Sequence, residues 1–343
     1  MRSFGSDNNS GVHPRILEAL AAANSDHAIA YGDDPWTAEA ASVVRELLGE
    51  NSIEPFFLFN GTGANVVALQ ACTLPFHSIL CAATAHIAVD ECGAPVKLTG
   101  ASLKEINTPD GKLTPELVRP HLHGFGFEHH SQPRVIAISQ TTELGTAYTP
   151  DEIRALAELA HAHEMLLFVD GTRIANACAM LGLSLREMTI DCGVDIFTLG
   201  GTKNGLMFGE VLVPLREELA QHIRYYRKQT TQLYSKMRYI AAQFIPYLRE
   251  DLWLENASRS NAAAQMLYRE MSRVKGIEIT QKVESNAIFF ILPKSITDRL
   301  RERYFFYDWD ESRNEMRLVC SWDTTEEDIR QFSDYLLKLT ADS

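Results

Sequence analysis

The sequence predicts an α/β protein with a mainly parallel sheet, followed by a smaller α+β domain. Short, continuously apolar runs alternate with helical stretches over most of the chain. Such runs are typical of strands buried on both faces of a parallel sheet. Near residue 246 the order of elements changes, so we expect a large domain over 1–245 and a small domain over 246–343.

The first fifty residues predict an arm and two helices. Apolar residues recur at helical spacing from Val12 to Asn24, and Pro14 stands near the start of that stretch, where its missing N–H costs little. The pattern repeats from Trp36 to Leu48, after a turn at 31–35.

The central part of the chain predicts the sheet. Five apolar runs are expected to be strands: 55–59, 79–82, 135–139, 166–169 and 196–199. Helices are expected at 64–72 and 151–163. A further strand at 211–213 precedes a helix-prone segment over 215–250, which is expected to lead out of the sheet.

The C-terminal part alternates helices and strands in another order. Its predicted elements are helices at 258–274 and 296–303, strands at 277–280, 287–292, 304–307 and 316–320, and a last helix from 324.

Composition and charge favour a soluble enzyme-sized protein. The 343 residues are 45% hydrophobic and 22% charged, close to the globular average. The net charge of -13 argues against nucleic acid or an anionic membrane as partner. No signal pattern or membrane-length apolar run is seen, so we expect a cytoplasmic protein that binds a small molecule or another copy of itself.

Cysteine and histidine patterns give no metal site. The six cysteines are scattered without a C-x-x-C pair, which favours reduced, mostly buried thiols. Four histidines gather in a loop, where metal ligation is conceivable but a solvated loop is the stronger interpretation: His121, His123, His129 and His130.

The residues that follow the predicted strands carry the chemistry, because ligands bind at the carboxyl ends of parallel strands. After strand 55–59 comes Asn60-Gly61-Thr62-Gly63 at the start of a helix. Backbone N–H groups and the helix N-terminus there make a seat for a phosphate. The alternative interpretation is an ordinary strand-to-helix turn, which would use the same residues.

Three further positions are more specific together than singly. Lys203 lies among glycines after strand 196–199, where desolvation would lower its pKa and suit it to forming a Schiff base; a solvated turn lysine is the alternative. Asp170 ends strand 166–169 and suits either a protonated ring nitrogen or a helix cap. His86 follows strand 79–82 and could stack on a ring or act as acid or base, although a lone loop histidine is usually neither.

Taken together, these positions match the needs of pyridoxal 5'-phosphate. The chain resembles the L-threonine aldolases among the pyridoxal phosphate enzymes of fold type I, the aspartate-aminotransferase fold. The resemblance covers nearly the whole chain and rests on these motifs: Ser6-Asp7-Asn8, Tyr31-Gly32-Asp33-Asp34, Phe59-Asn60-Gly61-Thr62, Thr84-Ala85-His86, Asp90-Glu91-Cys92-Gly93, Val169-Asp170-Gly171-Thr172-Arg173, Gly200-Gly201-Thr202-Lys203-Asn204-Gly205 and Ser321-Trp322-Asp323.

The resemblance implies a role for each site residue. Lys203 would form the Schiff base, Asp170 would contact the pyridine nitrogen, and His86 would stack on the ring. The remaining assignments are a phosphate cup at Gly61 and Thr62, and a carboxylate site at Ser6, Arg173 and Arg317, with Arg173 also close to the cofactor. Arginine suits a carboxylate because its fork binds both oxygens.

Two departures from the family pattern concern weaker candidates. Glu143 stands where many family members have a histidine near the substrate hydroxyl, which leaves His86 or an ordered water as candidate base. The segment from Lys228 to Arg238 lacks the family's glycine run, and these two residues are weaker candidates for a phosphate contact, including one in a neighbouring subunit. The family assembles as dimers or tetramers with active sites at the interface, so an oligomer is implied.

By resemblance, the chain is expected to cleave L-threonine or L-allo-threonine to glycine and an aldehyde, with phenylserine as a further candidate substrate. A β-eliminating lyase or an aminotransferase of the same fold is the nearest alternative. A non-catalytic or dinucleotide-binding protein is disfavoured, because the chain has Lys203 and no G-x-G-x-x-G.

Overall fold

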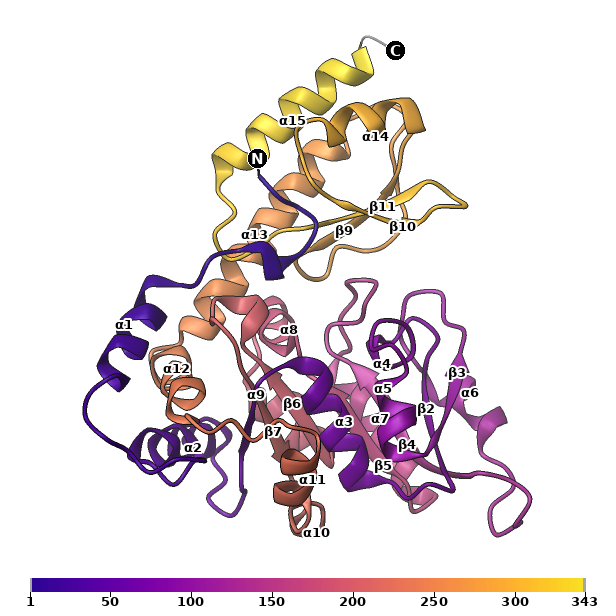
Figure 1. Cartoon of the computed structure of the whole chain (residues 1–343). Coiled ribbons are helices and arrows are strands. Elements are labelled where there is room, and N and C mark those ends of the chain that lie inside the picture. Colours follow the sequence, from indigo (N-terminus) through magenta and orange to yellow (C-terminus); the bar gives the residue numbers. More distant parts are fainter. Residues whose placement is uncertain (1, 342–343) are drawn as a thin grey trace.

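The computed structural model describes residues 2–341, which form two lobes joined by one long helix (Figure 1). The lower lobe is built on a seven-stranded sheet and the upper lobe on a four-stranded sheet. Within the described residues, no helix is both long and apolar enough to cross a membrane.

The large sheet is mainly parallel, as predicted. Its strands, in spatial order, are β1 (Phe56–Leu58), β7 (Glu210–Pro214), β6 (Ile196–Gly200), β5 (Leu166–Asp170), β4 (Gln132–Ser139), β2 (His77–Ala82) and β3 (Ser102–Ile106). Only β7 runs against its neighbours, β1 and β6. Edge strand β3 was not predicted, because its exposed Lys104 and Glu105 interrupt the apolar pattern.

The helices of the large lobe are α1 (Pro14–Ala23), α2 (Pro35–Leu48), α3 (Gly61–Cys72), α4 (His86–Val89), α5 (Ala94–Thr99), α6 (Pro115–Val118), α7 (Pro150–Ala162), α8 (Ile174–Leu181), α9 (Leu185–Met188), α10 (Glu217–Ala220), α11 (Ile223–Gln229) and α12 (Arg238–Arg249). They pack on the sheet, as α3 does on β5, β6 and β7, or on one another, as α1 does on α12. Short 3-10 turns lie at η1 (Asp7–Asn9), η2 (Arg119–His121), η3 (Ile190–Cys192) and η4 (Thr202–Asn204). Helix starts carry side-chain caps, as at Asp34, Asn60 and Thr149.

The helix-prone segment 215–250 forms three helices, α10, α11 and α12. The chain leaves α11 at Thr230, and Thr231 adopts a left-handed backbone with φ 62°. Gln232 then turns inward, where its Oε1 accepts a hydrogen bond from the Phe59 N–H at 3.0 Å. This long-range contact outweighs the helical propensity of the segment.

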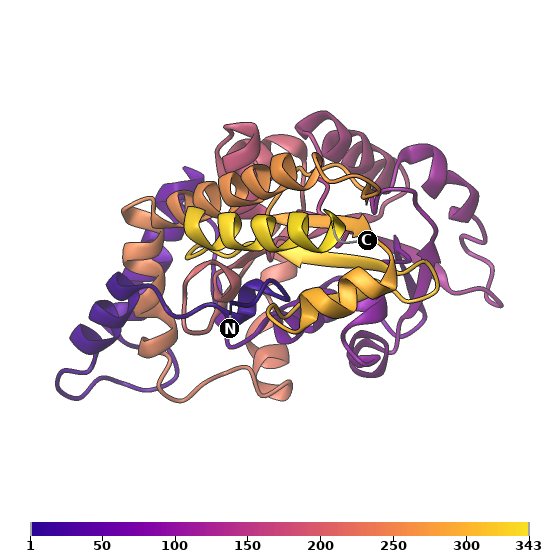
Figure 2. The same ribbon diagram turned by 90° about the horizontal axis from the view of Figure 1, so that it is seen from above.

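The small lobe contains an antiparallel sheet in the order β10 (Tyr307–Asp310), β11 (Glu315–Val319), β9 (Ala287–Ile291) and β8 (Glu278–Ile279). Helices α14 (Lys294–Arg301) and α15 (Glu326–Ala341) lie on its outer side, away from the large lobe (Figures 1 and 2). The strand predicted at 304–307 begins later, at Tyr307.

Helix α13 (Leu252–Met271) links the lobes. Its Ala257 belongs to the large apolar core, whereas Ala263 belongs to the core of the small lobe. The domain boundary at 245/246 stays a prediction.

The N-terminal arm is part of the small lobe's core before it crosses to the large one. Phe4 is fully buried, with its ring centroid 5.2 Å from that of Phe332. Its backbone N–H donates to Phe305 O and its carbonyl accepts from Val319 N, both at 2.8 Å. Asp7, three residues later, is already buried in the cleft between the lobes.

Candidate active site

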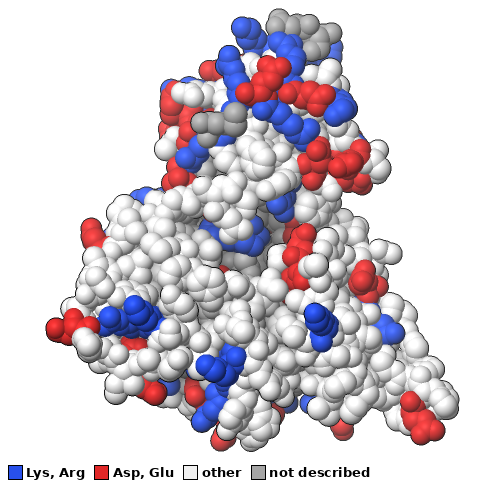
Figure 3. Space-filling model, in the orientation of Figure 1, with Lys and Arg blue, Asp and Glu red and all other residues white. Residues whose placement is uncertain are grey.

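A cavity of about 310 Å³ lies at the carboxyl ends of the central strands. Its lining includes four residues that the sequence singled out, Gly61, Thr62, His86 and Lys203. The full set is Asn8, Asn60, Gly61, Thr62, Asn65, His86, Asp90, Thr172, Thr202, Lys203 and Glu210. Lysine and arginine atoms are visible in the hollow between the lobes (Figure 3).

Lys203 is carried by the short turn η4 that follows β6. Asn204 holds this turn by donating hydrogen bonds to the Tyr247 hydroxyl and the Trp253 carbonyl, both at 2.8 Å. Burial, and secondly the charge of Arg173, lower the pKa of Lys203. Among residues 2–341, no carboxylate lies within ion-pair distance of its amine. Lys203 is therefore an available nucleophile, as a Schiff-base lysine must be.

The predicted phosphate cup lies at the start of α3. Asn60 Oδ1 accepts the Gly63 N–H at 2.8 Å and so caps the helix. Within the described chain, the N–H groups of Gly61 and Thr62 have no acceptor. A Cβ at Gly63 would lie 2.1 Å from the Gln232 side chain, so a larger residue there would displace Gln232 from its hydrogen bond with Phe59. Two free amides at a helix N-terminus fit a phosphate.

Asp170 lies behind the cavity and is held by several donors. Asn65 Nδ2 donates to Asp170 Oδ2 and to Glu91 Oε1, each at 2.8 Å. The other oxygen, Oδ1, accepts from the Thr172 N–H at 3.0 Å and from the Thr172 hydroxyl at 2.8 Å. These donors hold both oxygens of the Asp170 carboxyl in place.

His86 begins α4 and is oriented by Glu91. Its Nδ1 lies 2.8 Å from Glu91 Oε1, and this hydrogen bond is the main reason that the pKa of His86 is raised. Glu91 itself is buried, which raises the pKa of its carboxyl. The contact leaves Nε2 as the ring nitrogen available to a ligand.

Arg173 forms an ion pair with Asp7 of the N-terminal arm. Its Nε and Nη2 donate to the two oxygens of Asp7 at 2.7 and 2.8 Å. Asn286 of the small lobe also donates to Asp7, at 3.1 Å. The guanidinium predicted to bind a substrate carboxylate thus already holds a buried carboxylate of the chain.

Arg317 lies on β11 and faces a second, larger cavity. Its guanidinium lies 5.2 Å from the centre of the Trp309 ring, and its buried Nε has no hydrogen-bond partner in the described structure. Burial, and secondly the nearby Arg173, lower the pKa of Arg317. This second cavity has a volume of about 840 Å³ and includes Ser6. It shares Asn8 and Asp90 with the Lys203 cavity, so the two adjoin.

The three weaker candidates lie outside the Lys203 cavity. Glu143 Oε1 accepts from the Ser139 hydroxyl at 2.6 Å and from the His86 N–H at 2.9 Å, so it fixes the backbone of His86. Lys228 lies over the ring of Tyr31, with Nζ 5.0 Å from its centre. Arg238 donates to backbone carbonyls of the 25–26 loop. In a single chain, Lys228 and Arg238 do not reach the phosphate cup.

Sequence reasoning assigned no role to five polar residues that shape the site: Asp7, Asn65, Glu91, Glu210 and Gln232. A signal existed for two of them. Asn65 interrupts the apolar helix α3, and Glu210 begins the apolar strand β7. A buried polar side chain in an apolar element needs a partner and therefore indicates a site.

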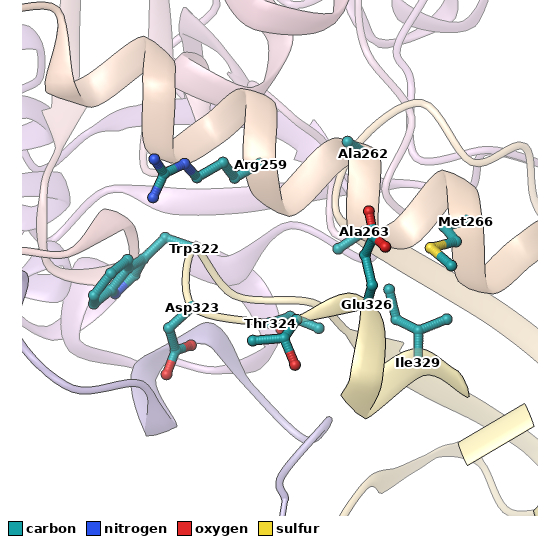
Figure 4. A pocket seen from close by; sticks show the side chains of 10 residues that line it. Arg259, Ala262, Ala263, Met266, Trp322, Asp323, Thr324, Glu326 and Ile329 are labelled. Atoms are coloured by element: carbon teal, nitrogen blue, oxygen red, sulfur yellow. The ribbon is translucent and has the colours of Figure 1, made fainter. Parts of the chain in front are cut away.

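The motif Ser321-Trp322-Asp323 fastens the arm rather than lining the Lys203 cavity. Trp322 Nε1 donates to Gly11 O at 3.1 Å, and Asp323 pairs with Arg2 at 3.3 Å. Trp322 and Asp323 do line a separate cavity of about 360 Å³ between α13 and the start of α15 (Figure 4). It shares no lining residue with the Lys203 cavity.

The four loop histidines line another surface cavity, together with Lys104. The rings of His123 and His130 lie 5.9 Å apart. Across residues 2–341, no group of three or more histidine, cysteine or acidic side chains is arranged to hold a metal ion.

Comparison with known proteins identifies the family of the chain. The family model described as beta-eliminating lyase matches residues 3–294. A low specificity L-threonine aldolase of Pseudomonas aeruginosa is 40% identical over 333 residues, covering 97% of this chain and 96% of the relative. One from Escherichia coli is 27% identical and covers 80% of this chain and 79% of its own.

Solved structures extend the comparison. A threonine aldolase of Leishmania major superimposes with a TM-score of 0.94 at 31% identity, covering 99% of this chain and 100% of its own. An alanine–glyoxylate aminotransferase of Nostoc, with a TM-score of 0.71 at 15% identity over 98% of this chain and 95% of its own, shares the fold alone. These matches confirm the resemblance drawn from the motifs and the predicted fold class.

Replacing Asp7 by Asn should destabilise the protein, because the guanidinium of Arg173, whose side chain is only 18% exposed, would lose its counter-charge. We expect the free energy of unfolding near neutral pH to fall by about 3–5 kcal/mol. Burial opposes ionisation of Asp7, but the charge and hydrogen bonds of Arg173 prevail and lower its pKa below 3.8. The pair's contribution is therefore complete above pH 3.8 and is lost as the pH falls through the folded-state pKa.

Urea unfolding of the wild type and Asp7→Asn at a series of pH values measures this difference. Asp323→Asn is the matched control, since its ion pair with Arg2 is partly exposed and should contribute at most about 1 kcal/mol. Equal losses in the two variants would contradict a special role for the buried pair.

Proposed function

The chain belongs to the beta-eliminating lyase family, and from this we propose that it is an aldolase that cleaves L-threonine or L-allo-threonine to glycine and acetaldehyde. Its cofactor is pyridoxal 5'-phosphate. One observation carries the proposal: an amine with a lowered pKa, two free helix amides and an aromatic ring face one cavity, with an acid held just behind it. This donor set fits an aldehyde, a phosphate and a pyridine ring.

When bound, the cofactor supplies an electron sink for the electron pair of the breaking Cα–Cβ bond. Lys203 would bond to the cofactor's aldehyde carbon, and Gly61 and Thr62 would hold its phosphate. Asp170, stabilised by Asn65 and Thr172, would keep the pyridine nitrogen protonated.

Arg317 and Ser6 would hold the substrate's carboxylate. Arg317 lines the second cavity together with Ser6, and its buried Nε has no hydrogen-bond partner in the described structure. Arg173 would contribute through the nitrogen that Asp7 does not use. Holding the carboxylate sets the orientation of the scissile bond, and such positioning can contribute several kcal/mol, roughly 7–11 at its limit.

His86 is our candidate for the base that takes the proton of the β-hydroxyl. It lines the cavity with Lys203, and Glu91 holds its Nδ1, so Nε2 is left to accept a proton. Glu143 binds the His86 backbone and lines neither of the two adjoining cavities. We therefore assign Glu143 a positioning role.

The second cavity, which Ser6, Trp309 and Arg317 line, has room for aldehydes of different sizes. Its volume of about 840 Å³ exceeds what the methyl group of threonine occupies, and Trp309 gives it an aromatic wall. Phenylserine is therefore a further candidate substrate.

We also propose an oligomer in which a second copy covers the mouth of the phosphate cup. Four large apolar residues, between 42% and 49% exposed, lie there: Tyr31, Phe59, Met207 and Tyr234. The rings of Phe59 and Tyr234 lie 6.2 Å apart, and Tyr31 N–H donates to Ser235 O. Met207 precedes Phe208, whose ring lies 5.3 Å from that of Phe59. Such a patch favours self-association, and a second copy is the route by which Lys228 or Arg238 could reach a cup. The dimer or tetramer expected from the resemblance fits this patch.

A cytoplasmic location is consistent with the cysteines. All six are free thiols, and Cys92 is exposed. Free thiols are maintained in a reducing compartment.

Aldehyde release from L-threonine, L-allo-threonine and L-phenylserine tests the activity directly. We expect aldehyde and glycine in equal amounts, and a Lys203→Ala variant should lose at least roughly 10³-fold in kcat. The same variant should lose the borohydride-reducible link to the cofactor, whereas Lys275→Ala, at an exposed lysine, should keep both. A yellow wild-type protein that releases no aldehyde would point to elimination or transamination instead.

Replacing His86 by Phe should keep ring stacking and remove the base. We expect cofactor affinity to be retained and kcat to fall by about 10²–10⁴-fold, the usual contribution of a general base. Glu143→Gln should change kcat far less. A large loss in Glu143→Gln with full activity in His86→Phe would reverse the two assignments.

The Glu91→Gln variant should move the pH profile of kcat/KM. Glu91 raises the pKa of His86, and the base must be unprotonated to act. The wild-type rate therefore falls as the pH drops through that raised pKa, and without the carboxylate this acidic limb should shift to lower pH. An unmoved limb would show that His86 is not the titrating base.

Mixing two inactive variants should reveal a site shared between copies. If Arg238 of one copy serves the site of another, hybrids of Lys203→Ala and Arg238→Ala chains should regain activity that neither variant shows alone. Light scattering would report the size of the assembly. A monomer, or hybrids without activity, would contradict the shared site.

A further inference from the structure

Glu210 occupies a position between the two main parts of the cofactor site. It is the first residue of β7 and pairs with Leu58 of β1 on one side and Gly200 of β6 on the other. Strand β1 leads to the phosphate cup and β6 leads to Lys203. The Glu210 side chain lines the cavity that both share.

This carboxyl group is buried and incompletely bonded. Glu210 is only 3% exposed, and its Oε2 has no hydrogen-bond partner in the described structure. A buried polar atom without a partner costs free energy, so a hydrogen bond from Oε2 to a molecule bound in this cavity would be favourable. Nothing in the mechanism derived above uses it.

The surroundings of Glu210 favour its neutral form. Burial raises the pKa of this carboxyl to about 7, although hydrogen bonding from Thr202 and the charge of Lys203 act in the opposite direction. The ionisable groups facing it are Lys203 on η4, Asp170 on β5 and the buried Tyr247 on α12. Strand β1 and helix α3 bring only uncharged residues to this cavity.

A phosphate in the cup would add negative charge to the same cavity. Like charges raise the pKa of a carboxyl further, so Glu210 would hold its proton while the phosphate is bound. A protonated carboxyl has an O–H that can donate to a phosphate oxygen, which an ionised carboxylate cannot do.

We propose that Glu210 binds the cofactor's phosphate as a neutral carboxylic acid, with the otherwise unpartnered Oε2 as the donor. When the cofactor leaves at a pH above 7, Glu210 gives up this proton to solvent and adds a negative charge near Lys203. The inference rests on the cofactor assigned above but not on the reaction catalysed. Binding of the cofactor is thereby linked to uptake of a proton by Glu210.

The linkage has a defined sign. Below pH 7 Glu210 is already protonated in the free enzyme, so its contribution to affinity is independent of pH. Above that value a proton must be taken up on binding, and the dissociation constant should rise by about tenfold per pH unit.

Equilibrium dialysis of the cofactor-free enzyme with pyridoxal phosphate and with pyridoxal tests the proposal, because only the first ligand has a phosphate. Glu210→Gln keeps a donor at every pH, and Glu210→Leu has none. We expect the ratio of wild-type to Glu210→Gln dissociation constants to be flat below about pH 7 and to rise above it for pyridoxal phosphate only. Taking the ratio removes the titration of the phosphate, which both proteins share. Pyridoxal, which also bonds to Lys203, controls for the effect of Glu210 on the titration of Lys203.

Glu210→Leu should weaken pyridoxal phosphate at all pH values by roughly 10- to 100-fold, as expected for a lost hydrogen bond to a charged group. Two controls separate this effect from misfolding. Each variant should keep its thermal unfolding transition, and Glu210→Gln should keep its affinity for pyridoxal phosphate. Equal changes for pyridoxal and pyridoxal phosphate would show that Glu210 acts on Lys203, and unchanged affinities in both variants would show no role. Either result overturns the proposal, whether or not the enzyme releases aldehyde.

Discussion

The site depends on the close approach of two backbone segments, one just after β5 and the other at the end of β6. A Cβ on Gly171 would lie 1.9 Å from the carbonyl oxygen of Thr198, and one on Gly200 would lie 2.3 Å from that of Thr172. No other residue type fits at either position without displacing backbone. The approach is closed by hydrogen bonds from Gly171 N–H to the Thr198 hydroxyl at 2.9 Å and from Gly200 N–H to Gly171 O at 3.1 Å. Because the two strand ends meet in this way, Asp170 and Lys203 serve one cavity.

Charges around this cavity are mutually dependent, since they are buried together. Lys203 is influenced by Arg173 on one side and by Asp7, Asp170 and Glu210 on the other. In a low-dielectric site each of these charges changes the protonation of its neighbours. A lysine with a lowered pKa and a carboxyl with a raised one are thus two consequences of the same desolvation. The hollow that admits the cofactor also sets the protonation states that the chemistry needs.

Sequence patterns predicted the helices and strands that a local run of residues specifies. Continuous apolar runs predicted the central strands, and the residues just after them included Lys203, Asp170 and Gly61. The patterns missed strand β3, whose edge position allows polar side chains, and they missed the break in 215–250, which a contact with Phe59 imposes. Contacts between residues that are distant in sequence were also not predicted. Arg173 binds Asp7 across 166 positions, and Glu210 faces Lys203 only because β7 turns back beside β6. Such pairings depend on topology and register, which no local pattern contains.

The N-terminal arm contacts both lobes, next to the place where the substrate's carboxylate would bind. Phe4 is anchored in the small lobe's core, whereas Asp7 binds Arg173 of the large lobe and Asn286 of the small one. Arg317, on β11 of the small lobe, lies close enough to Arg173 for each charge to affect the other. A carboxylate held between them would therefore be bound from both lobes at once. Its distance from Lys203 would then be set by the arm, whose buried ion pair resists any relative displacement that would separate the two arginines. The geometry of bond cleavage thus depends on residues at the start of the chain as much as on those around the cofactor.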